Sequence, residues 1–312
     1  MRLDALLACT IRYDMADRKK RLESNVPGNF YVDASCINCD TCRQLAPDSF
    51  EEVGEWSAVT TQPQEDESIH QAYQALLACP VGSIGTEHSD KRRMSAAMSS
   101  FPLRLDGDVF YCGFNSEKSF GANSYFIRRP EGNWLIDSPR YIKHLVEAIE
   151  RMGGLRYIFL THEDDVADAA RYASRFGSTR IIHREDSGAM PDAEWIVDAG
   201  EAITLAPRFD LIPVPGHTPG SIALLYDHRF LFTGDHLWWD PEKRSLEAPS
   251  QLVWRSQALA TSIERLLHYR FEWVLAGHDG RVRLSPPEMK SALQDLVSRR
   301  GHDASAKSLP SQ

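Results

Sequence analysis

The sequence predicts an α+β protein of two domains, and three observations lead to this prediction. The 312 residues, 42% of them hydrophobic, are enough for two modules that each have a core. Four cysteines are gathered between Cys36 and Cys79, as in a small metal-holding domain. Further along the chain, several apolar, strand-like runs end in a His or Asp, which is where open α/β architectures build their sites.

The order of these patterns sets the expected domain boundaries. A basic run, RKKR, is offset by nearby acids and is typical of a solvated arm. The run KRRMSAAMSS, basic and then rich in small residues, reads as a linker. We therefore expect an arm at residues 1–29, a cysteine-bearing domain at 30–90, a linker at 91–105, a larger domain at 106–300 and a tail at 301–312.

The cysteine spacing indicates an iron–sulfur site. The segment Cys36-x2-Cys39-x2-Cys42, followed at a distance by Cys79 and a proline, has the four-thiolate spacing that wraps a cubane cluster. It resembles bacterial-type ferredoxins, in which a further Cys-Pro would serve a second cluster. Here that proline, Pro47, is retained but alanine precedes it, so the resemblance implies one [4Fe-4S] cluster. Four thiolates would also satisfy zinc, but the Cys-Pro and Pro47 favour iron–sulfur.

The charge of the cysteine-bearing segment is strongly negative. Residues 30–90 carry eleven Asp or Glu and a single cation, Arg43, giving −10 against −9 for the whole chain. An acidic face steers a basic partner at long range, so this favours electron transfer with a basic redox protein. The alternative is that the charge serves solubility alone.

The larger domain is organised around the run VPGHTPGS. Its His217 lies on a loop stiffened by prolines and opened by glycines, which suits a preorganised metal ligand. Three other strand-like runs end in the same way, with His162, Asp235 and His278. These four residues are candidate metal ligands.

The motifs LTH, PGHTPGS, FTGDH and AGH, with NWLIDSP before them, resemble the metallo-β-lactamase superfamily over residues 106–285. The resemblance implies an αββα sandwich joined to the ferredoxin-like domain. In that superfamily a His-x-His-x-Asp-His loop helps to bind two metals. This chain has His162 and then Asp164, and if its loop is two residues longer, Asp168 takes the place of the aspartate and Ala169 that of the last histidine. Since alanine binds nothing, the second metal position has lost a ligand.

The resemblance implies one Fe, Zn or Mn ion, or two. His162, His217 and Asp235 form a 2-His-1-carboxylate set, which suits Fe(II), and extra carboxylates favour iron or manganese over zinc. Asp164, Asp168 and His278 complete the candidate metal ligands. The candidate catalytic residues are His278, Asp168 and His236.

We expect an oxidoreductase in which the cluster exchanges electrons with a non-haem metal, because hydrolysis needs no electron carrier. The alternatives are a metal-dependent ester or thioester hydrolase with a structural or regulatory cluster, and a catalytically degenerate binding protein. The expected partners are a small-molecule substrate and a basic redox protein. We expect neither nucleic-acid nor membrane binding, since one short basic run is weak evidence and no window nears 20 apolar residues. Three closely spaced cysteines indicate a reducing compartment, the cytoplasm.

Overall fold

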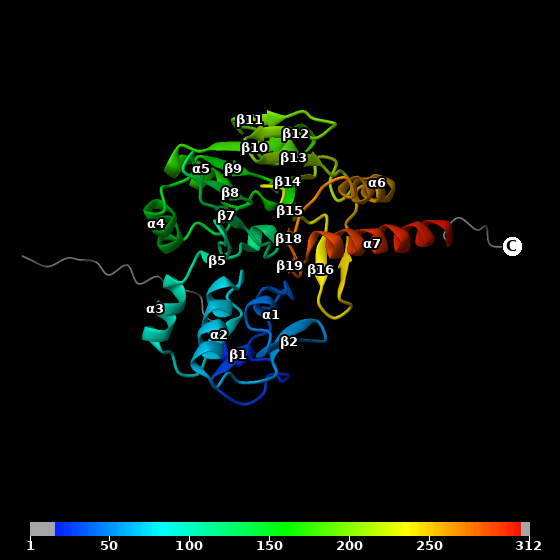
Figure 1. Cartoon of the computed structure of the whole chain (residues 1–312). Coiled ribbons are helices and arrows are strands. Elements are labelled where there is room, and N and C mark those ends of the chain that lie inside the picture. The colour runs from blue at the N-terminus through cyan, green and yellow to red at the C-terminus, as the bar shows by residue number, and fades with distance from the viewer. Residues whose placement is uncertain (1–15, 307–312) are drawn as a thin grey trace, which may run out of the picture.

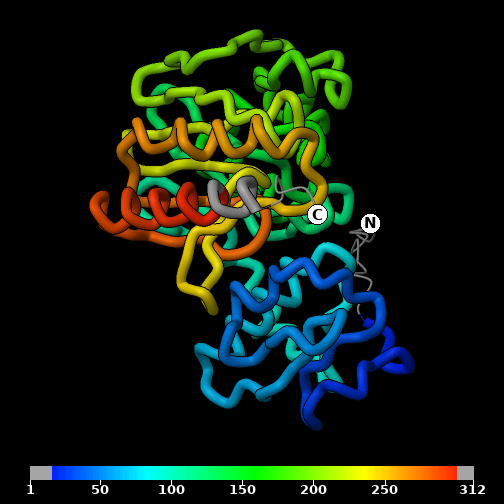
Figure 2. Tube along the Cα trace, turned by 90° about the vertical axis from the view of Figure 1, so that its right-hand side faces the viewer, coloured from blue at the N-terminus to red at the C-terminus, as the bar shows by residue number. Residues whose placement is uncertain are grey.

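The computed structural model describes residues 16–306, with side chains for residues 16–300. A small N-terminal module lies against a larger sandwich, and two views at right angles show the two bodies side by side (Figure 1, Figure 2). The predicted two-domain α+β architecture is confirmed.

The N-terminal module combines two small sheets with two helices. Strand β1 (Phe30–Val32) pairs antiparallel with β4 (Ile84–Thr86), bringing the ends of the cysteine-bearing segment together. A hairpin is formed by β2 (Phe50–Val53) and β3 (Trp56–Val59), with its turn at Gly54. Helix α1 (Thr41–Leu45) follows the first cysteines, and α2 (Asp66–Ala78) leads into Cys79.

The described part of the expected arm, residues 16–29, is packed onto this module. The 3-10 turn η1 (Arg18–Lys20) opens it. The Asn25 side chain is buried and accepts the backbone N–H groups of Val32 and Val59. Arg21 lies 3.1 Å from Glu87 and donates to the Val26 carbonyl. These hydrogen bonds make the segment part of the domain, and residues 1–15 of the expected arm lie outside the described residues.

The expected linker is also folded. Residues Lys91–Ser99 form helix α3, whose first turn is capped because the Asp90 side chain accepts the N–H groups of Arg92 and Arg93. Ala97 is fully buried as α3 packs on α2. The small residues that suggested a linker instead allow a close helix–helix approach, and β5 (Leu103–Asp106) already belongs to the sandwich.

Within the described residues the sandwich consists of two large sheets. The first has seven strands in the order β11-β10-β9-β8-β7-β6-β5, and the second has six in the order β12-β13-β14-β15-β18-β19. A small hairpin, β16–β17, stands beside the second sheet (Figure 1). The strands not yet given are β6 (Val109–Tyr111), β7 (Tyr125–Ile127), β8 (Trp134–Ile136), β9 (Tyr157–Phe159), β10 (Thr179–His183), β11 (Trp195–Val197), β12 (Ile203–Ala206), β13 (Phe209–Pro213), β14 (Ile222–Tyr226), β15 (Phe230–Gly234), β16 (Trp238–Asp240), β17 (Ser245–Glu247), β18 (Trp273–Ala276) and β19 (Val282–Arg283).

Helices cover both outer faces, which confirms the αββα order. Figure 1 shows α4 (Lys143–Arg151) and α5 (Ala169–Phe176) on the seven-stranded side, with α6 (Ser256–Leu266) and α7 (Pro286–Ala306) on the other. Alternation along β14 produces both interfaces, because Leu224 faces the inter-sheet core and Leu225 faces α6 and α7. Three further 3-10 turns are η2 (Glu117–Ser119), η3 (Glu163–Asp165) and η4 (Arg184–Ala189).

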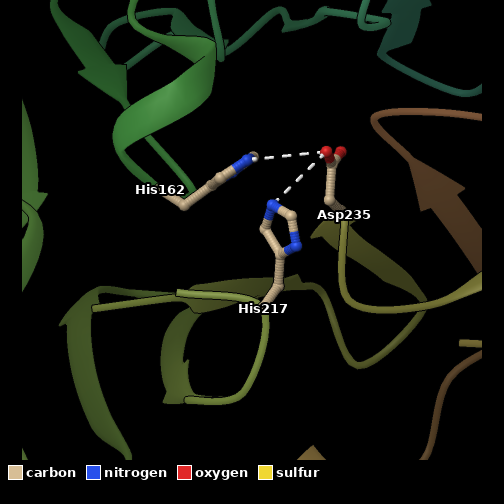
Figure 3. A group of neighbouring side chains, drawn as sticks. All are labelled: His162, His217 and Asp235. Carbon is tan, nitrogen blue, oxygen red and sulfur yellow. Dashed lines mark ion pairs between the residues drawn. The ribbon is translucent and has the colours of Figure 1, made fainter. Parts of the chain in front are cut away.

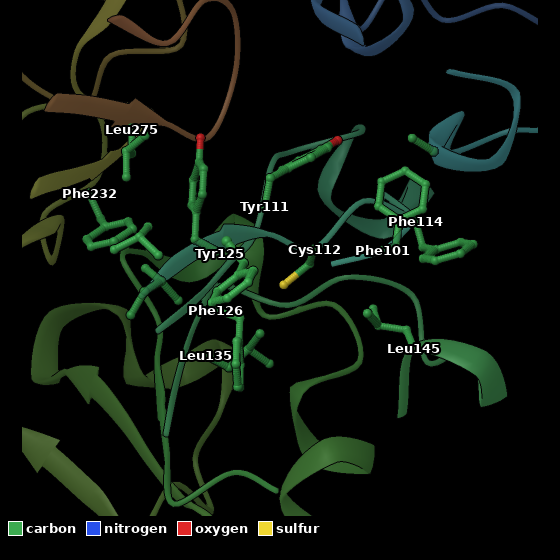
Figure 4. Close-up of a cluster of buried hydrophobic side chains, with 14 of the residues drawn as sticks. Phe101, Tyr111, Cys112, Phe114, Tyr125, Phe126, Leu135, Leu145, Phe232 and Leu275 are labelled. Carbon is green, nitrogen blue, oxygen red and sulfur yellow. The ribbon is translucent and has the colours of Figure 1, made fainter. Parts of the chain in front are cut away.

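The inter-sheet core positions the ligand-bearing strand ends. Tyr125 of the first sheet packs against Phe232 of the second, with ring centroids 5.4 Å apart (Figure 4). The Tyr125 hydroxyl donates to the Ala276 carbonyl at 2.6 Å, at the end of β18. This buried hydrogen bond ties the sheets together two residues before His278.

Candidate functional site

The four predicted cluster ligands line one small buried pocket in the N-terminal module. Cys36 and Cys39 belong to the loop that enters α1, Cys42 lies in the first turn of α1, and Cys79 follows α2. The loop wraps tightly because Asn38 and Asp40 both adopt left-handed backbone conformations. The rest of the pocket is lined by four apolar residues, Val32, Ile37, Val81 and Ile84, and by the hydroxyl-bearing residues Thr41, Ser57 and Ser83.

This pocket fits a cubane cluster. Backbone N–H groups point at two of the sulfurs, from Asn38 to Cys36 Sγ at 3.4 Å and from Ser83 to Cys79 Sγ at 3.3 Å. Such hydrogen bonds are among the features that tune iron–sulfur clusters. Burial raises the pKa of the Cys39 thiol to about 11, so iron must displace the proton for this sulfur to act as a ligand.

Five of the predicted metal ligands meet at one edge of the sandwich. Each follows a strand: His162 and Asp164 come after β9, His217 after β13, Asp235 after β15 and His278 after β18. Figure 3 shows the imidazoles of His162 and His217 pointing at the Asp235 carboxylate. Ligand atoms of these three side chains all lie within 4.8 Å of one another.

The spacing of these atoms fits a metal ion. Asp235 Oδ2 lies 3.6 Å from His162 Nε2, 3.7 Å from His217 Nε2 and 3.6 Å from His278 Nε2. Asp164 Oδ2 lies 3.3 Å from His217 Nε2 and 3.7 Å from His162 Nε2. Four ligand atoms placed tetrahedrally about 2.1 Å from one ion would be about 3.4 Å apart. Among the described residues, the buried His162 Nε2 has no hydrogen-bond partner, which leaves it available for such an ion.

A buried polar chain orients His162. Thr161 Oγ1 is 3.0 Å from both Asp137 carboxylate oxygens and 3.0 Å from His162 Nδ1. Because the hydroxyl has one proton and Asp137 accepts it, the hydroxyl oxygen accepts the Nδ1–H of His162. The Nε2 lone pair then faces the group of candidate ligands His162, Asp164, His217, Asp235 and His278, which we call the cradle. This is the orientation that a metal ligand requires.

The charges of the cradle are strongly coupled. Burial alone would raise the pKa of Asp235, but the imidazoles of His278 and His162 bring it below its usual range. Burial opposes protonation of His162, yet the carboxylates of Asp165 and Asp235 raise its pKa to about 10. The carboxylates around His162 therefore favour a positive charge at this position.

The structure does not bring Asp168 to this centre. Its carboxylate accepts Lys118 Nζ and the backbone N–H of Tyr141, both at 2.8 Å, on the far side of the loop. Ala169 is fully buried at the start of α5. Asp168 is therefore a structural ion-pair partner, and the prediction that it is a ligand and a catalytic residue is wrong.

Because Asp168 lies away from the centre, the structure gives no support for a loop two residues longer than in the resembling family. Counting from His162 without an insertion, Val166 and Ala167 stand at the family's Asp and last His, and both line the cavity above the cradle. The depleted second position therefore lacks two ligands. The reason for the error is that spacing alone could not tell which of several acids in the loop faces inward.

His236 also lies outside the cavity. Its side chain is buried, and burial lowers its pKa to about 3, with Arg300 contributing. The residues that line the cavity include His278 but not His236. A neutral buried imidazole away from the cavity does not fit the predicted catalytic role.

Two acids near the centre were not predicted. Asp165 is 1% exposed, and a Cβ on Gly277 would lie 3.1 Å from its Oδ2 and 2.5 Å from Asp235 Oδ1, so both carboxylates sit behind the end of β18. Asp186, from η4, accepts the Gly220 N–H at 2.8 Å and the Thr218 hydroxyl, which orders the His217 loop. In the sequence both acids stand in charged runs of the kind that normally face solvent, so no local signal marks them.

The cavity over the centre has a volume of about 960 Å³. His217, Asp235 and His278 form its floor, and the segments 117–120 and 252–254 form walls. A metal ion held by these residues would keep open coordination positions. They would face a cavity that is large enough for a small molecule.

Comparison with known proteins agrees with this division of the chain. Residues 32–86 match the family model of the 4Fe-4S single cluster domain of Ferredoxin I, and residues 104–286 match that of the metallo-beta-lactamase superfamily. The described part of the chain contains no helix that is both long and apolar enough to cross a membrane.

Curated relatives cover the larger domain. Hydroxyacylglutathione hydrolase of Acidiphilium cryptum is 29% identical over 171 residues, which is 53% of this chain and 70% of the relative. The enzyme of the same name from Serratia proteamaculans is 27% identical over 136 residues, 42% of this chain and 53% of the relative.

Solved structures resemble the same part of the chain. The crystal structure of ETHE1 from Myxococcus xanthus has 21% identity and a TM-score of 0.47, covering 64% of this chain and 92% of that one. With a matching family model over more than half of its length, this chain belongs to the metallo-beta-lactamase superfamily.

Proposed function

We propose that this protein is an electron-transfer-linked metalloenzyme. Cys36, Cys39, Cys42 and Cys79 would hold one [4Fe-4S] cluster, and a non-haem iron ion would be held by His162, His217 and Asp235. When bound, these groups supply one-electron chemistry, the electron passing between an external carrier protein, the cluster and the ion. Two imidazoles with a carboxylate, and a second carboxylate from Asp164, favour iron or manganese over zinc.

The observation that carries the proposal is a buried hydrogen-bonded chain between the two modules. Cys39 Sγ lies 3.4 Å from Thr41 Oγ1, and Thr41 Oγ1 accepts Asn115 Nδ2 at 3.0 Å. Asn115 Nδ2 also lies 3.3 Å from Asn123 Oδ1. The Asn123 backbone N–H donates to the Gly277 carbonyl at 2.6 Å, directly before His278. Four side-chain and backbone contacts thus connect a cluster ligand to the metal-binding loop.

A second contact joins the modules at another cluster ligand, Cys79. Arg140 Nη2 donates to the carbonyls of Leu77 and Cys79, both at 3.0 Å. Arg140 follows Asp137 by three residues, on the same loop that orients His162. A cluster that served only the stability of its own module would need neither connection.

The exposed side of the cysteine pocket suits an external carrier. Cys36 and Cys39 are partly exposed, whereas Cys42 and Cys79 are buried. The hairpin beside them exposes Glu51, Glu52 and Glu55, and Asn38 hydrogen-bonds Glu52 across this side. We propose that a basic redox protein docks here, in a reducing compartment such as the cytoplasm.

Metal analysis and spectroscopy test the proposal. After anaerobic purification and reconstitution, we expect the four iron atoms of the cluster plus one further iron ion per chain. Stoichiometric reduction of the cluster should change the paramagnetic resonance signal of the ion. In Cys39→Ser the ion should stay bound but stop responding, while Cys112→Ser, at a buried cysteine outside the pocket, should behave as the unmodified chain. Two results would count against electron transfer. One is zinc bound at His162, His217 and Asp235, and the other is an ion whose paramagnetic resonance signal does not change when the cluster is reduced.

The second candidate is a metal-dependent thioester hydrolase, favoured by the curated relatives that are named hydroxyacylglutathione hydrolase. In that case Asp235, His162 and His217 would hold the ion that activates water, and the cluster would be structural. Zinc in the His site and thioester hydrolysis that persists in Cys39→Ser would support this candidate over the first.

A further inference from the structure

Large exposed apolar side chains are concentrated at the mouth of the cavity. Among the described residues, the three most exposed large hydrophobic side chains are Leu252 at 86%, Phe120 at 62% and Trp254 at 48%. All three line this one cavity. The next, Ile203, is 38% exposed and lies elsewhere. Concentrated exposure of this kind marks a binding surface.

The backbone that carries Trp254 is held in place by hydrogen bonds. The Trp254 backbone N–H donates to the His217 carbonyl at 2.9 Å, and the N–H of Arg255 donates to the Gly216 carbonyl. The wall that carries Leu252 and Trp254 is therefore attached to the ligand loop itself. Leu252 and Phe120 both have left-handed backbones, a costly conformation for such residues that persists where the surroundings impose it.

The opposite wall is attached to the cysteine module. Phe120 precedes Gly121, and a Cβ on Gly121 would lie 2.8 Å from Cys39 Cβ. The Asn115 side chain donates to the Gly121 carbonyl at 2.7 Å. The apolar mouth therefore has a defined position with respect to both metal-binding pockets.

The charges around the cavity are unfavourable for anions. Four carboxylates line it, those of Glu117, Glu163, Asp164 and Asp235. Lys118 is the only Lys or Arg among the lining residues that the structure describes, and its Nζ already pairs with Asp168 at 2.8 Å. A divalent ion bound by Asp164 and Asp235 would offset these two charges, but Glu117 and Glu163 would still repel a ligand with several carboxylates.

We propose that the cavity binds a neutral substrate with an alkyl or aryl chain, seated against Phe120, Leu252 and Trp254 above the metal cradle. This inference deepens the proposed function, because it names the substrate class of the same site, but it depends on neither electron transfer nor the identity of the ion. It separates this chain from a protein built for glutathione conjugates, which carry two carboxylates.

Direct binding tests the substrate class. The probe is N-phenyl-1-naphthylamine, which is neutral and aromatic, measured by equilibrium dialysis with the reconstituted protein. Straight-chain amides from butanamide to octanamide should displace it, each added methylene strengthening competition about fourfold. S-hexylglutathione, with the same six-carbon chain as hexanamide but two carboxylates, should compete at least tenfold less well.

Variants locate the binding surface. Leu252→Asn and Phe120→Asn keep a residue that tolerates the left-handed backbone but remove the apolar surface, and Trp254→Ser removes the third apolar side chain. Each should weaken probe binding about tenfold and flatten the chain-length dependence. Ile203→Ser is the matched control, an exposed apolar residue outside the cavity, and should change neither.

Three results would overturn the proposal. The first is that S-hexylglutathione competes with the probe as well as hexanamide does. The second is that Ile203→Ser weakens probe binding as much as Leu252→Asn does. The third is a smaller sedimenting species in Leu252→Asn, which would show that the surface instead packs against a second copy of the chain. Because the probe does not bind metals, a failure of the redox proposal, seen as zinc or an unresponsive ion, leaves these outcomes unchanged.

Discussion

The loop after His162 presents two apolar side chains to the cavity. Val166 and Ala167 line the cavity where the family loop would present an Asp and a His, while Asp235 and His278 remain in place beside them. The remaining ligands therefore define one complete site and one incomplete site. The chemistry of two adjacent metal ions is not expected from these residues.

Restoring the missing ligands should rebuild the second site. In the double variant Val166→Asp and Ala167→His, we expect bound metal to rise from one ion to two per chain at the His site, counted by elemental analysis. Ala167 has a left-handed backbone (φ 32°), which His tolerates better than most residues. Ala169→His is the control, because that side chain would point into a packed core, destabilise the protein by about 1–3 kcal/mol and add no metal.

The hydroxyl of Thr161 connects His162 to Asp137, and its removal should weaken metal binding. Thr161→Val deletes the group that fixes the His162 tautomer, so we expect affinity for the ion to fall roughly 10- to 100-fold in competition with a chelator. Thr161→Ser keeps the hydroxyl and should retain the original affinity. Equal losses in both variants would mean that packing, not the hydrogen bond, matters.

At the scale of elements, the loop after η2 packs against the cysteine-bearing module and so connects the two modules. Gly121 has φ of +90°, and a side chain there would meet Cys39 and Pro80 at about 3 Å. Gly121→Ala should therefore displace the cysteine loop and reduce cluster content, read from the absorption near 400 nm. Gly54→Ala, at a similar positive φ with open space around it, carries the backbone strain alone and should keep the cluster. Cluster loss in both would point to strain rather than contact.

The edge of the seven-stranded sheet depends on a nearly buried arginine. Arg180 of β10 makes a bidentate pair with Glu194, just before β11, and hydrogen bonding from Arg180 lowers the Glu194 pKa to about 2. Because this pKa lies below the ordinary value of 4.5, the unfolded chain binds more protons between these values. The pair therefore stabilises the fold above about pH 4.5 and loses that effect as the pH falls toward 2.

Glu194→Gln should lower stability near pH 6 and change it little near pH 2. The carboxylate is 44% exposed, so solvent screening limits the expected loss to about 1 kcal/mol, measured by urea unfolding. The control is Asp198→Asn, whose partner Arg184 is itself exposed, and it should have a smaller effect. An equal loss at both pH values would contradict the assignment.

At the scale of the whole molecule, Asn115 is a buried hydrogen-bonded link between the two domains. It is fully buried, accepts the Tyr111 hydroxyl at 2.8 Å and donates to Thr41 and the Gly121 carbonyl. Asn115→Leu leaves these groups without a hydrogen-bond partner, and each unpaired buried group lowers the free energy of unfolding by about 1–3 kcal/mol. We expect calorimetry to show two separate unfolding transitions in place of one.

Asn133→Leu provides the matched control for that experiment. Asn133 is equally buried and bonds the carbonyls of Met152 and Gly154, but within the sandwich alone. Its replacement should lower the transition temperature without splitting the transition. A single transition in Asn115→Leu would mean that the modules are coupled by other contacts.

The sequence by itself determined the fold class, the four cluster cysteines and the ligands at strand ends. These features follow from local patterns, because the spacing of Cys36, Cys39 and Cys42 sets how a loop can wrap metal, and apolar runs place His162, His217 and Asp235 at a sheet edge.

Only the tertiary structure decided which acids face the metal and how the two pockets are joined. Asp164, Asp165 and Asp168 look alike in sequence, and their roles depend on Lys118, Gly277 and other groups brought from distant elements. The folded arm and helix α3 were missed because packing on α2 and β1, rather than propensity, orders them. The cavity mouth joins Phe120 to Leu252 across more than a hundred residues of chain, and no local pattern records such a contact.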